Sequence, residues 1–438
     1  MKVLHHGGKN TVTGSCHELV LQNRSVLIDC GLLQGQDHAQ QQSWDLDFSI
    51  AHLKAVVLTH SHIDHIGRLP WLLAAGYKGP IYCTEATAEL VPLMLEDGLK
   101  LQLGMRRHQR EKVLDFIRAL IRPCPYSVWV EIEESTSLRF QPAGHILGSA
   151  YVEFHLSNQE AVVFSGDLGP RNTPLLPDPL SPEKADYLFI ESTYGNKIHE
   201  DVESRSRRLL SIIEHALGDG GVIVIPAFSV GRTQELLFDI ELLIHEHALQ
   251  DSLPIILDSP LAKKVTNTYR HFKKLWGSEA KERLDHHRHP LAFDQCITIE
   301  SHADHLQLVN RLASTSEAAI VVAASGMCEG GRVVNYLEAL LPDERNDVLF
   351  AGYQAEGTLG RRIQDGEESL LIEGKRVKVK AQVHTMSGYS AHADMNDLLQ
   401  FVTAIPTPPK EVHLIHGEED SKKALYQKLI NLGYNCVI

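Results

Sequence analysis

The chain of 438 residues contains few cysteines, and no two of them stand close together. The seven cysteines are scattered along the sequence, and no Cys-x-x-Cys pair occurs. Disulfide frameworks and thiolate zinc sites use an even number of cysteines or closely spaced pairs. Both classes are therefore excluded, and we expect buried free thiols in a reducing compartment, which predicts a cytoplasmic protein.

Long apolar runs are also missing. A membrane-spanning helix needs about 20 predominantly apolar residues in a row, and no stretch of the sequence approaches that length. The first eight residues contain no apolar run that resembles a secretion signal. We therefore expect a protein without a membrane partner.

Positive charge is scarce. Lysine and arginine number 42 against 56 aspartates and glutamates, which gives a net charge of -14. A uniformly basic coat for nucleic acid is excluded, so a polyanion must bind at a local site that overcomes the overall repulsion. Aromatic residues make up only 6% of the chain, so sequence-specific stacking on bases is not indicated.

Short, β-branched apolar runs recur along the chain and predict buried strands. They cover residues 26–28, 55–58, 161–164, 187–190, 222–225, 320–322 and 412–415. Helical stretches such as residues 85–103 and 233–247 separate several of them, which predicts a layered α/β fold. The alternating residues 377–383 predict one further strand with a solvated face.

The length predicts two or three domains. Strand–glycine loop–helix units follow one another between about residues 200 and 370, which is typical of a small parallel sheet. We therefore predict a first domain over residues 1–200, an inserted α/β domain over residues 201–370, and a return to the first domain over residues 371–438.

The strongest functional signal is a run of potential metal ligands directly after the apolar residues 55–58. His60, His62, Asp64 and His65 fall within six residues. Imidazole nitrogens and a carboxylate suit Zn²⁺. A turn at this point can direct His60 and His62 to one side and Asp64 and His65 to another. Each pair then needs further ligands from elsewhere in the chain to complete the coordination of a metal.

Further candidate ligands stand at the ends of other predicted strands. Asp29, Asp167 and His416 each follow an apolar run, and His145 lies in a glycine-flanked turn. The carboxyl ends of buried strands meet at one edge of a sheet, and a bridging carboxylate would hold two metals about 3.5–4 Å apart. Spacing alone does not choose between zinc, manganese and iron. The similar run at residues 300–305 lacks partner strands, so we interpret it as structural or surface.

Motifs along nearly the whole chain give it a family resemblance. They are Thr13–Cys16, Asp29–Gly31, His60–His65, Ala143–Gly148, Ser165–Asp167, Glu191–Gly195, Pro226–Arg232, Asp258–Pro260, Ser325–Met327, Gly352–Ala355, Gly357–Arg361, Ser390–Asp394 and His416–Glu418. With them the chain resembles the metallo-β-lactamase superfamily and, within it, the RNA-directed β-CASP nucleases. That branch includes the polyadenylation-cleavage endonuclease and its bacterial and archaeal relatives. The metal run is shared across the superfamily, whereas Glu191, His392 and His416 are specific to the β-CASP branch.

The resemblance implies a fold and a metal centre. The fold is an αββα metallo-β-lactamase sandwich interrupted by a β-CASP domain with a parallel α/β sheet. Two Zn²⁺ ions are implied as cofactors. The first zinc would be bound by His60, His62, His145 and Asp167. The second would be bound by Asp64, His65, the bridging Asp167 and His416. Asp29 would support the ligand turn from behind.

The resemblance also implies a zinc-dependent ribonuclease that hydrolyses phosphodiester bonds in RNA processing or decay. His392 would be the general acid, and Glu191 would orient it. Asp64 is the third residue that we predict to be catalytic. We expect single-stranded RNA as the partner. Cleavage within the chain and cleavage from a 5′ end both remain open, and so does the oligomeric state, for which a homodimer is one option.

Two glycine turns of the inserted domain precede helices, whose N-terminal N–H groups suit phosphates. The predicted phosphate or RNA contacts are Ser229, Arg232, Ser325, Gly326, Met327 and Arg361. The basic clusters at residues 263–264 and 270–274 could also guide an RNA backbone, but most such clusters are solvated helix faces, so we rank Arg232 and Arg361 ahead of them.

Three alternatives are weighed against a ribonuclease. A DNA nuclease is opposed by His416, because the DNA-directed branch usually lacks histidine there. A small-molecule hydrolase of the same superfamily needs neither the insertion nor the pair of Glu191 and His392. A non-catalytic nucleic-acid scaffold should have lost ligands, and every implied ligand is present.

Overall fold

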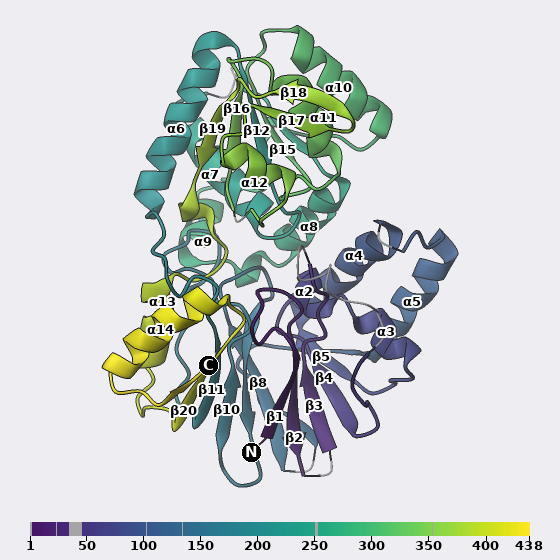
Figure 1. Ribbon diagram of the computed structural model, residues 1–438, viewed down its shortest axis with the longest axis vertical. Helices are drawn as coiled ribbons and strands as arrows, with labels where there is room; N and C mark the ends of the chain where they lie inside the picture. Colours follow the sequence, from purple (N-terminus) through teal and green to yellow (C-terminus); the bar gives the residue numbers. More distant parts are fainter. Residues whose placement is uncertain are drawn as a thin grey trace. The chain divides into compact units, whose positions relative to one another are not determined.

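The computed structural model of the chain describes residues 2–22, 24–34, 46–101, 103–133, 135–249, 253–352 and 354–438. The chain divides into two compact units (Figure 1). Unit 1 joins residues 1–198 to residues 392–438, and unit 2 comprises residues 199–391. The return to unit 1 thus begins at residue 392, where residue 371 was predicted. The reason is that β19 (Gln382–Thr385) pairs with β16 (Asp347–Phe350) in the sheet of unit 2.

Unit 1 contains two sheets. The first has the order β1-β2-β3-β4-β5-β6, and its strands from β3 onward are parallel. These strands are β1 (Lys2–Gly7), β2 (Cys16–Leu21), β3 (Arg24–Ile28), β4 (Leu53–Val57), β5 (Ile81–Thr84) and β6 (Ile121–Cys124). The second sheet has the order β21-β20-β11-β10-β9-β8-β7. Its strands are β7 (Val130–Glu133), β8 (Thr136–Pro142), β9 (Ala150–His155), β10 (Ala161–Phe164), β11 (Tyr187–Glu191), β20 (Glu411–Ile415) and β21 (Cys436–Val437).

The two sheets pack face to face between layers of helices. Buried apolar side chains of both sheets, such as Val57 and Phe164, form one core cluster between them. A second cluster joins the first sheet to α2–α5, and a third joins the second sheet to α13 and α14. These helices are α2 (Ile63–Ile66), α3 (Leu69–Ala74), α4 (Glu85–Leu101), α5 (Arg107–Leu120), α13 (Met395–Thr403) and α14 (Glu419–Asn431). The predicted αββα sandwich is confirmed.

Unit 2 is built on one parallel sheet of order β14-β13-β15-β12-β16-β19. Its further strands are β12 (Val222–Pro226), β13 (Ile255–Asp258), β14 (Cys296–Thr298) and β15 (Ala319–Ala323), and β17 (Ser369–Ile372) pairs with β18 (Lys375–Lys378) in a separate hairpin. Its helices are α6 (Val202–Asp219), α7 (Arg232–Glu246), α8 (Pro260–His271), η1 (Lys273–Leu275), α9 (Ser278–Asp285), α10 (His302–Ser314), α11 (Arg332–Leu340) and α12 (Leu359–Gln364). Every residue of β12 is buried, as expected of a parallel strand covered on both faces.

The apolar runs predicted as strands are all strands, but the single strand predicted over residues 377–383 is wrong. β18 ends at Lys378 and belongs to the hairpin, whereas β19 begins at Gln382 in the parallel sheet. Between them the N–H groups of Lys380 and Ala381 both donate to the Leu341 carbonyl, at 2.8 and 3.0 Å, which turns the chain. Within the described residues, no helix is long and apolar enough to cross a membrane.

Candidate metal centre

The seven predicted metal ligands lie together in unit 1, although they come from distant parts of the chain. Four belong to the turn after β4 and to the short helix α2 that follows it. The other three follow β8, β10 and β20. The turn after β4 provides His60, His62, Asp64 and His65, and the remaining ligands are His145, Asp167 and His416. Convergence at the carboxyl ends of buried strands is therefore what brings them together.

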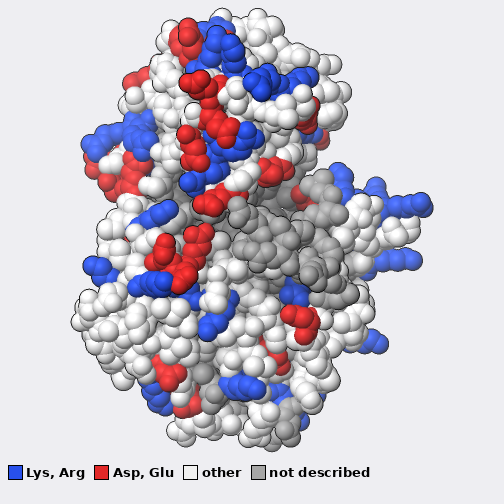
Figure 2. Space-filling view, in the orientation of Figure 1, with Lys and Arg blue, Asp and Glu red and all other residues white. Residues whose placement is uncertain are grey.

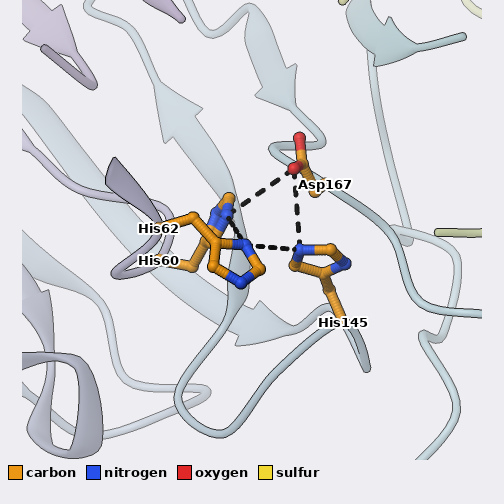
Figure 3. A group of neighbouring side chains, drawn as sticks. All are labelled: His60, His62, His145 and Asp167. Carbon is orange, nitrogen blue, oxygen red and sulfur yellow. Dashed lines mark hydrogen bonds and ion pairs between the residues drawn. The ribbon is translucent and has the colours of Figure 1, made fainter. Parts of the chain in front are cut away.

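The first group consists of His60, His62, His145 and Asp167, and one ligand atom of each lies within 4.8 Å of the others (Figure 3). Nδ1 of His62 lies 3.1 Å from Nε2 of His60 and 3.0 Å from Nε2 of His145. Oδ2 of Asp167 lies 3.6 Å from both of those Nε2 atoms. Ligand atoms about 2.1 Å from a tetrahedral Zn²⁺ are about 3.4 Å apart, so these spacings fit one cation.

Burial keeps the imidazoles of this group in the form that binds metals. His60 is fully buried, and burial lowers its pKa well below the ordinary value. Burial also lowers the pKa of His62, to about 4. Both rings are therefore neutral at pH 7, and each offers a nitrogen lone pair to a cation.

The second group consists of Asp64, His65, His416 and the same Asp167. Nε2 of His65 lies 3.6 Å from Oδ2 of Asp64 and 3.2 Å from Oδ2 of Asp167. Nε2 of His416 lies 3.5 Å from the other oxygen, Oδ1, of Asp167. Asp167 thus faces both groups with its two carboxylate oxygens.

Several atoms of the second group are buried without a hydrogen bond. Nε2 of His65, both ring nitrogens of His416 and Oδ1 of Asp167 have no hydrogen-bond partner among the described residues. Leaving a buried polar atom unpaired costs about 1–3 kcal/mol, and such atoms are rare in folded proteins. A cation would pair the atoms that face Asp167, so this part of the site also fits a metal.

Asp29 contacts the ligand turn through three hydrogen bonds. Its Oδ1 accepts a hydrogen bond from the Thr59 N–H at 2.8 Å, and its Oδ2 accepts one from the Thr59 hydroxyl at 2.9 Å. Nδ1 of His65 lies 2.7 Å from Oδ2. A proton on Nδ1 leaves Nε2 with its lone pair toward the ligand group. Thr59 was not among the predicted site residues, and its place directly before His60 is the signal that could have indicated it.

His392 and Glu191 form a pair beside the shared carboxylate. Nδ1 of His392 lies 3.3 Å from Oε1 of Glu191 and 3.9 Å from Oδ2 of Asp167. Glu191 is fully buried, and its Oε1 also accepts a hydrogen bond from the Leu168 N–H at 2.7 Å. Burial alone would lower the pKa of His392, but these carboxylates outweigh it and raise the pKa to about 8. These carboxylates therefore favour the protonated form of the ring.

Comparisons with known proteins agree with this geometry. The metallo-β-lactamase superfamily model matches residues 11–212, the β-CASP domain model matches residues 233–363, and the Zn-dependent metallo-hydrolase RNA specificity domain model matches residues 376–438. The chain is 37% identical over 433 residues to a ribonuclease of Thermus thermophilus, and the match covers 99% of this chain and 97% of that protein. The chain belongs to the β-CASP family of the metallo-β-lactamase superfamily.

Other relatives of this β-CASP protein carry different names. It is 31% identical over 451 residues to the transcription termination factor FttA of Methanocaldococcus jannaschii, with 98% of this chain and 70% of that protein covered. A crystal structure of a protein of unknown function from Enterococcus faecalis matches 100% of this chain and 97% of its own, with a TM-score of 0.56 and 13% identity. The last likeness concerns the fold alone.

Five of the six predicted RNA contacts in unit 2 follow β12 and β15, which are neighbouring parallel strands, and the sixth, Arg361, lies in α12. Oγ of Ser229 lies 3.2 Å from Oγ of Ser259, in the loop after β13. A Cβ on Gly326 would lie 2.8 Å from the Phe228 ring, so the loops after β12 and β15 are in contact. The Met327 carbonyl accepts a hydrogen bond from the first turn of α12 at 3.3 Å, which places that helix beside the same loops.

The fold constrains both arginines of this set, Arg232 by burial and Arg361 by an ion pair. Arg232 begins α7 and is only 7% exposed. Nε of Arg361 lies 2.9 and 3.0 Å from the two carboxylate oxygens of Asp365. Ser325 has a buried hydroxyl that lacks a hydrogen-bond partner in the described part of the chain. The roles of all six residues toward RNA stay predictions.

The second histidine-rich run, residues 300–305, has a structural role. His305 is fully buried, with Nδ1 2.7 Å from Oδ2 of Asp258 and Nε2 2.9 Å from Oδ1 of Asn335. The Tyr336 hydroxyl donates to the same carboxylate oxygen at 2.6 Å. Both ring nitrogens of His305 are therefore occupied within the fold of unit 2, and the interpretation of this run as structural is confirmed for His305.

Proposed function

We propose that this β-CASP protein is a ribonuclease that uses two Zn²⁺ ions to hydrolyse phosphodiester bonds of single-stranded RNA. The observation that carries the proposal is that two ligand groups share Asp167 beside the pair of His392 and Glu191. The RNA specificity domain matched over residues 376–438 and the ribonuclease of Thermus thermophilus support RNA as the substrate.

The ligand groups would hold the two ions side by side. One group is His60, His62, His145 and Asp167, and the other is Asp64, His65, Asp167 and His416. When bound, the ions supply a hydroxide nucleophile at neutral pH and offset the charge of a phosphodiester. Asp29 keeps the His65 lone pair directed into the second group through the hydrogen bond to Nδ1.

His392 would donate a proton to the departing ribose oxygen. Its Nδ1 faces Glu191, so Nε2 is the atom that carries the transferable proton. A neutral alcohol leaves more easily than an alkoxide, and such general acids contribute about 10²–10⁴-fold to the rate. Attack on phosphorus with departure of this oxygen yields a 3′-hydroxyl and a 5′-phosphate.

The cysteines support a reducing compartment, for which we propose the cytoplasm. All seven are free thiols, and six of them are buried. The homodimer stays a prediction.

Cleavage assays with matched substrates test the proposed function. Single-stranded RNA and DNA of one sequence, each labelled at one end, are incubated with the zinc-loaded protein and with a chelator-treated sample. We expect cleavage of RNA, products with 5′-phosphates, and loss of cleavage after chelation. Preference for DNA, or no cleavage of either polymer, would overturn the proposal. Substrates with a 5′-phosphate or a 5′-hydroxyl then separate internal cleavage from cleavage that starts at the 5′ end.

A further inference from the structure

Unit 2 contains a cavity of about 430 Å³ that the proposed chemistry does not use. It is lined by α8 near its C-terminal end, by η1 and by α9 with the loop that follows it, and among the described residues no aspartate or glutamate lines it. Its basic residues are Arg270, His271, Lys273 and His289. The volume lies in the range of small-ligand sites. The net charge of the chain is -14, and acidic and basic side chains are interspersed on the face shown in Figure 2, so a cavity with only basic charged groups stands out.

Two cations of this cavity lack a protein partner. Arg270 and Lys273 are both exposed. Among the described residues, neither of them forms an ion pair or a side-chain hydrogen bond. By contrast, Arg283 and Arg288, which do not line the cavity, both pair with Glu241. The positive charge of Arg270 and Lys273 is therefore available to an anion from solution.

The floor of the cavity is apolar. Trp276 and Leu291 line it and are only 3% and 5% exposed. The Trp276 indole N–H donates to the Tyr269 carbonyl at 3.1 Å, which fixes the ring. A small inorganic anion needs no apolar floor, whereas a nucleotide joins an anionic phosphate to a sugar and a base with apolar faces. The lining therefore favours a nucleotide.

Helix electrostatics explain only part of this arrangement. Arg270 and His271 stand in the last turn of α8, where cations stabilise the negative end of the helix dipole. Lys273 belongs to η1, and His289 comes after α9. Basic side chains from three segments thus line one cavity, which the dipole of a single helix does not require.

We propose that this cavity binds one nucleotide of an RNA chain, with its phosphodiester held by Arg270 and Lys273. The proposal rests on the proposed ribonuclease function and adds an RNA-binding site built entirely from unit 2. Here the phosphate charge would be held by the two cations and the sugar and base would lie against the apolar floor, without hydrogen bonds that read the base.

Binding measurements on the full-length, zinc-loaded chain test this site. The cavity variant carries Arg270→Glu and Lys273→Glu. The control carries Arg376→Glu and Lys378→Glu, which make the same charge change at exposed positions of β18 outside the cavity. Fluorescence anisotropy with a labelled single-stranded RNA is recorded from low to moderate salt, with His392→Ala added to every protein to slow cleavage.

We expect the cavity variant to bind RNA about tenfold more weakly than the control variant. Each lost phosphate contact should also reduce the slope of log K against log salt by about 0.7, or about 1.4 for both. The neutral pair Arg270→Gln and Lys273→Gln should give a smaller loss in the same direction, and thermal unfolding checks that each variant is folded.

Equal RNA affinity and equal salt slopes in the cavity and control variants would overturn the proposal. It would also be overturned if the cavity variant lost only the binding of free adenosine monophosphate or inorganic phosphate, because the occupant would then not be RNA. A wild-type protein that binds RNA through this cavity but cleaves none would contradict the ribonuclease function and leave the binding site supported.

Discussion

Asp29→Asn replaces one carboxylate oxygen by an amide NH₂ group and keeps the shape of the side chain. The native carboxylate accepts hydrogen bonds at 2.8 and 2.9 Å from the N–H and hydroxyl of Thr59, and His65 Nδ1 lies 2.7 Å from it. The asparagine oxygen can take the place of Oδ1 and keep the bond from the Thr59 N–H. Its NH₂ group then faces His65. Because NH₂ only donates, His65 must accept through Nδ1 and carry its proton on Nε2.

The size of the loss in zinc affinity depends on which ring nitrogen of His65 carries the proton. Nε2 of His65 is the atom that faces Asp64 and Asp167, and a protonated Nε2 offers no lone pair to a cation. Changes behind a ligating histidine typically weaken metal binding about 10–100-fold, or about 1.4–2.7 kcal/mol. We expect about 100-fold for Asp29→Asn, because it imposes the wrong tautomer. Asp29→Ala only removes the orienting group, so we expect about tenfold.

Competition with a zinc chelator measures both affinities. Wild type, Asp29→Asn and Asp29→Ala are titrated with Zn²⁺, and one of the two binding steps should weaken in the order given. The other step should change much less, because the group of His60, His62 and His145 has no direct hydrogen bond to Asp29 among the described residues. Wild-type affinity in Asp29→Asn, or a greater loss in Asp29→Ala, would refute the reasoning.

Three further predictions concern single side chains. His392→Ala should keep the metal content and slow RNA cleavage by about 10²–10⁴-fold, with a much smaller effect on a diester whose leaving group is nitrophenolate; equal losses on both substrates would argue against proton donation. Arg205→Ala should lower the free energy of unfolding in urea by about 3–5 kcal/mol, because the buried Asp239 carboxylate, 3.0 Å from Arg205 Nε, loses the cation that pairs with it; a loss below about 1 kcal/mol would be inconsistent with this ion pair. Gly31→Ala should deplete the bound zinc found by elemental analysis, because its Cβ would overlap the Asp64 carbonyl oxygen. The control is Gly218→Ala, whose Cβ meets no atom within 4 Å, and equal zinc in both variants would count against the prediction.

The grouping of the metal ligands could be predicted from the sequence because most of them follow short apolar runs. Parallel strands place their carboxyl ends at one edge of a sheet, so Asp167 and His416 fall near each other once β10 and β20 are assigned. The pair of Glu191 and His392 is different, because 201 residues separate them and no spacing links them. That pair was predicted from the family resemblance.

Which basic side chains are free to bind RNA could not be predicted in the same way. The Asp365 partner of Arg361 stands four residues further on, a helical spacing that is visible in the sequence. The burial of Arg232 and the lack of a partner for Arg270 depend on tertiary packing. The turn between β18 and β19 likewise depends on hydrogen bonds to the distant Leu341 carbonyl, which overrides the local alternating pattern.

The number of zinc ions bound per chain tests the shared use of Asp167 most directly. Elemental analysis of the purified wild-type protein should give close to two ions. His416→Ala should give close to one, because His416 belongs to only one ligand group. One ion in the wild type, or equal zinc in the two proteins, would contradict a centre in which two cations share this carboxylate.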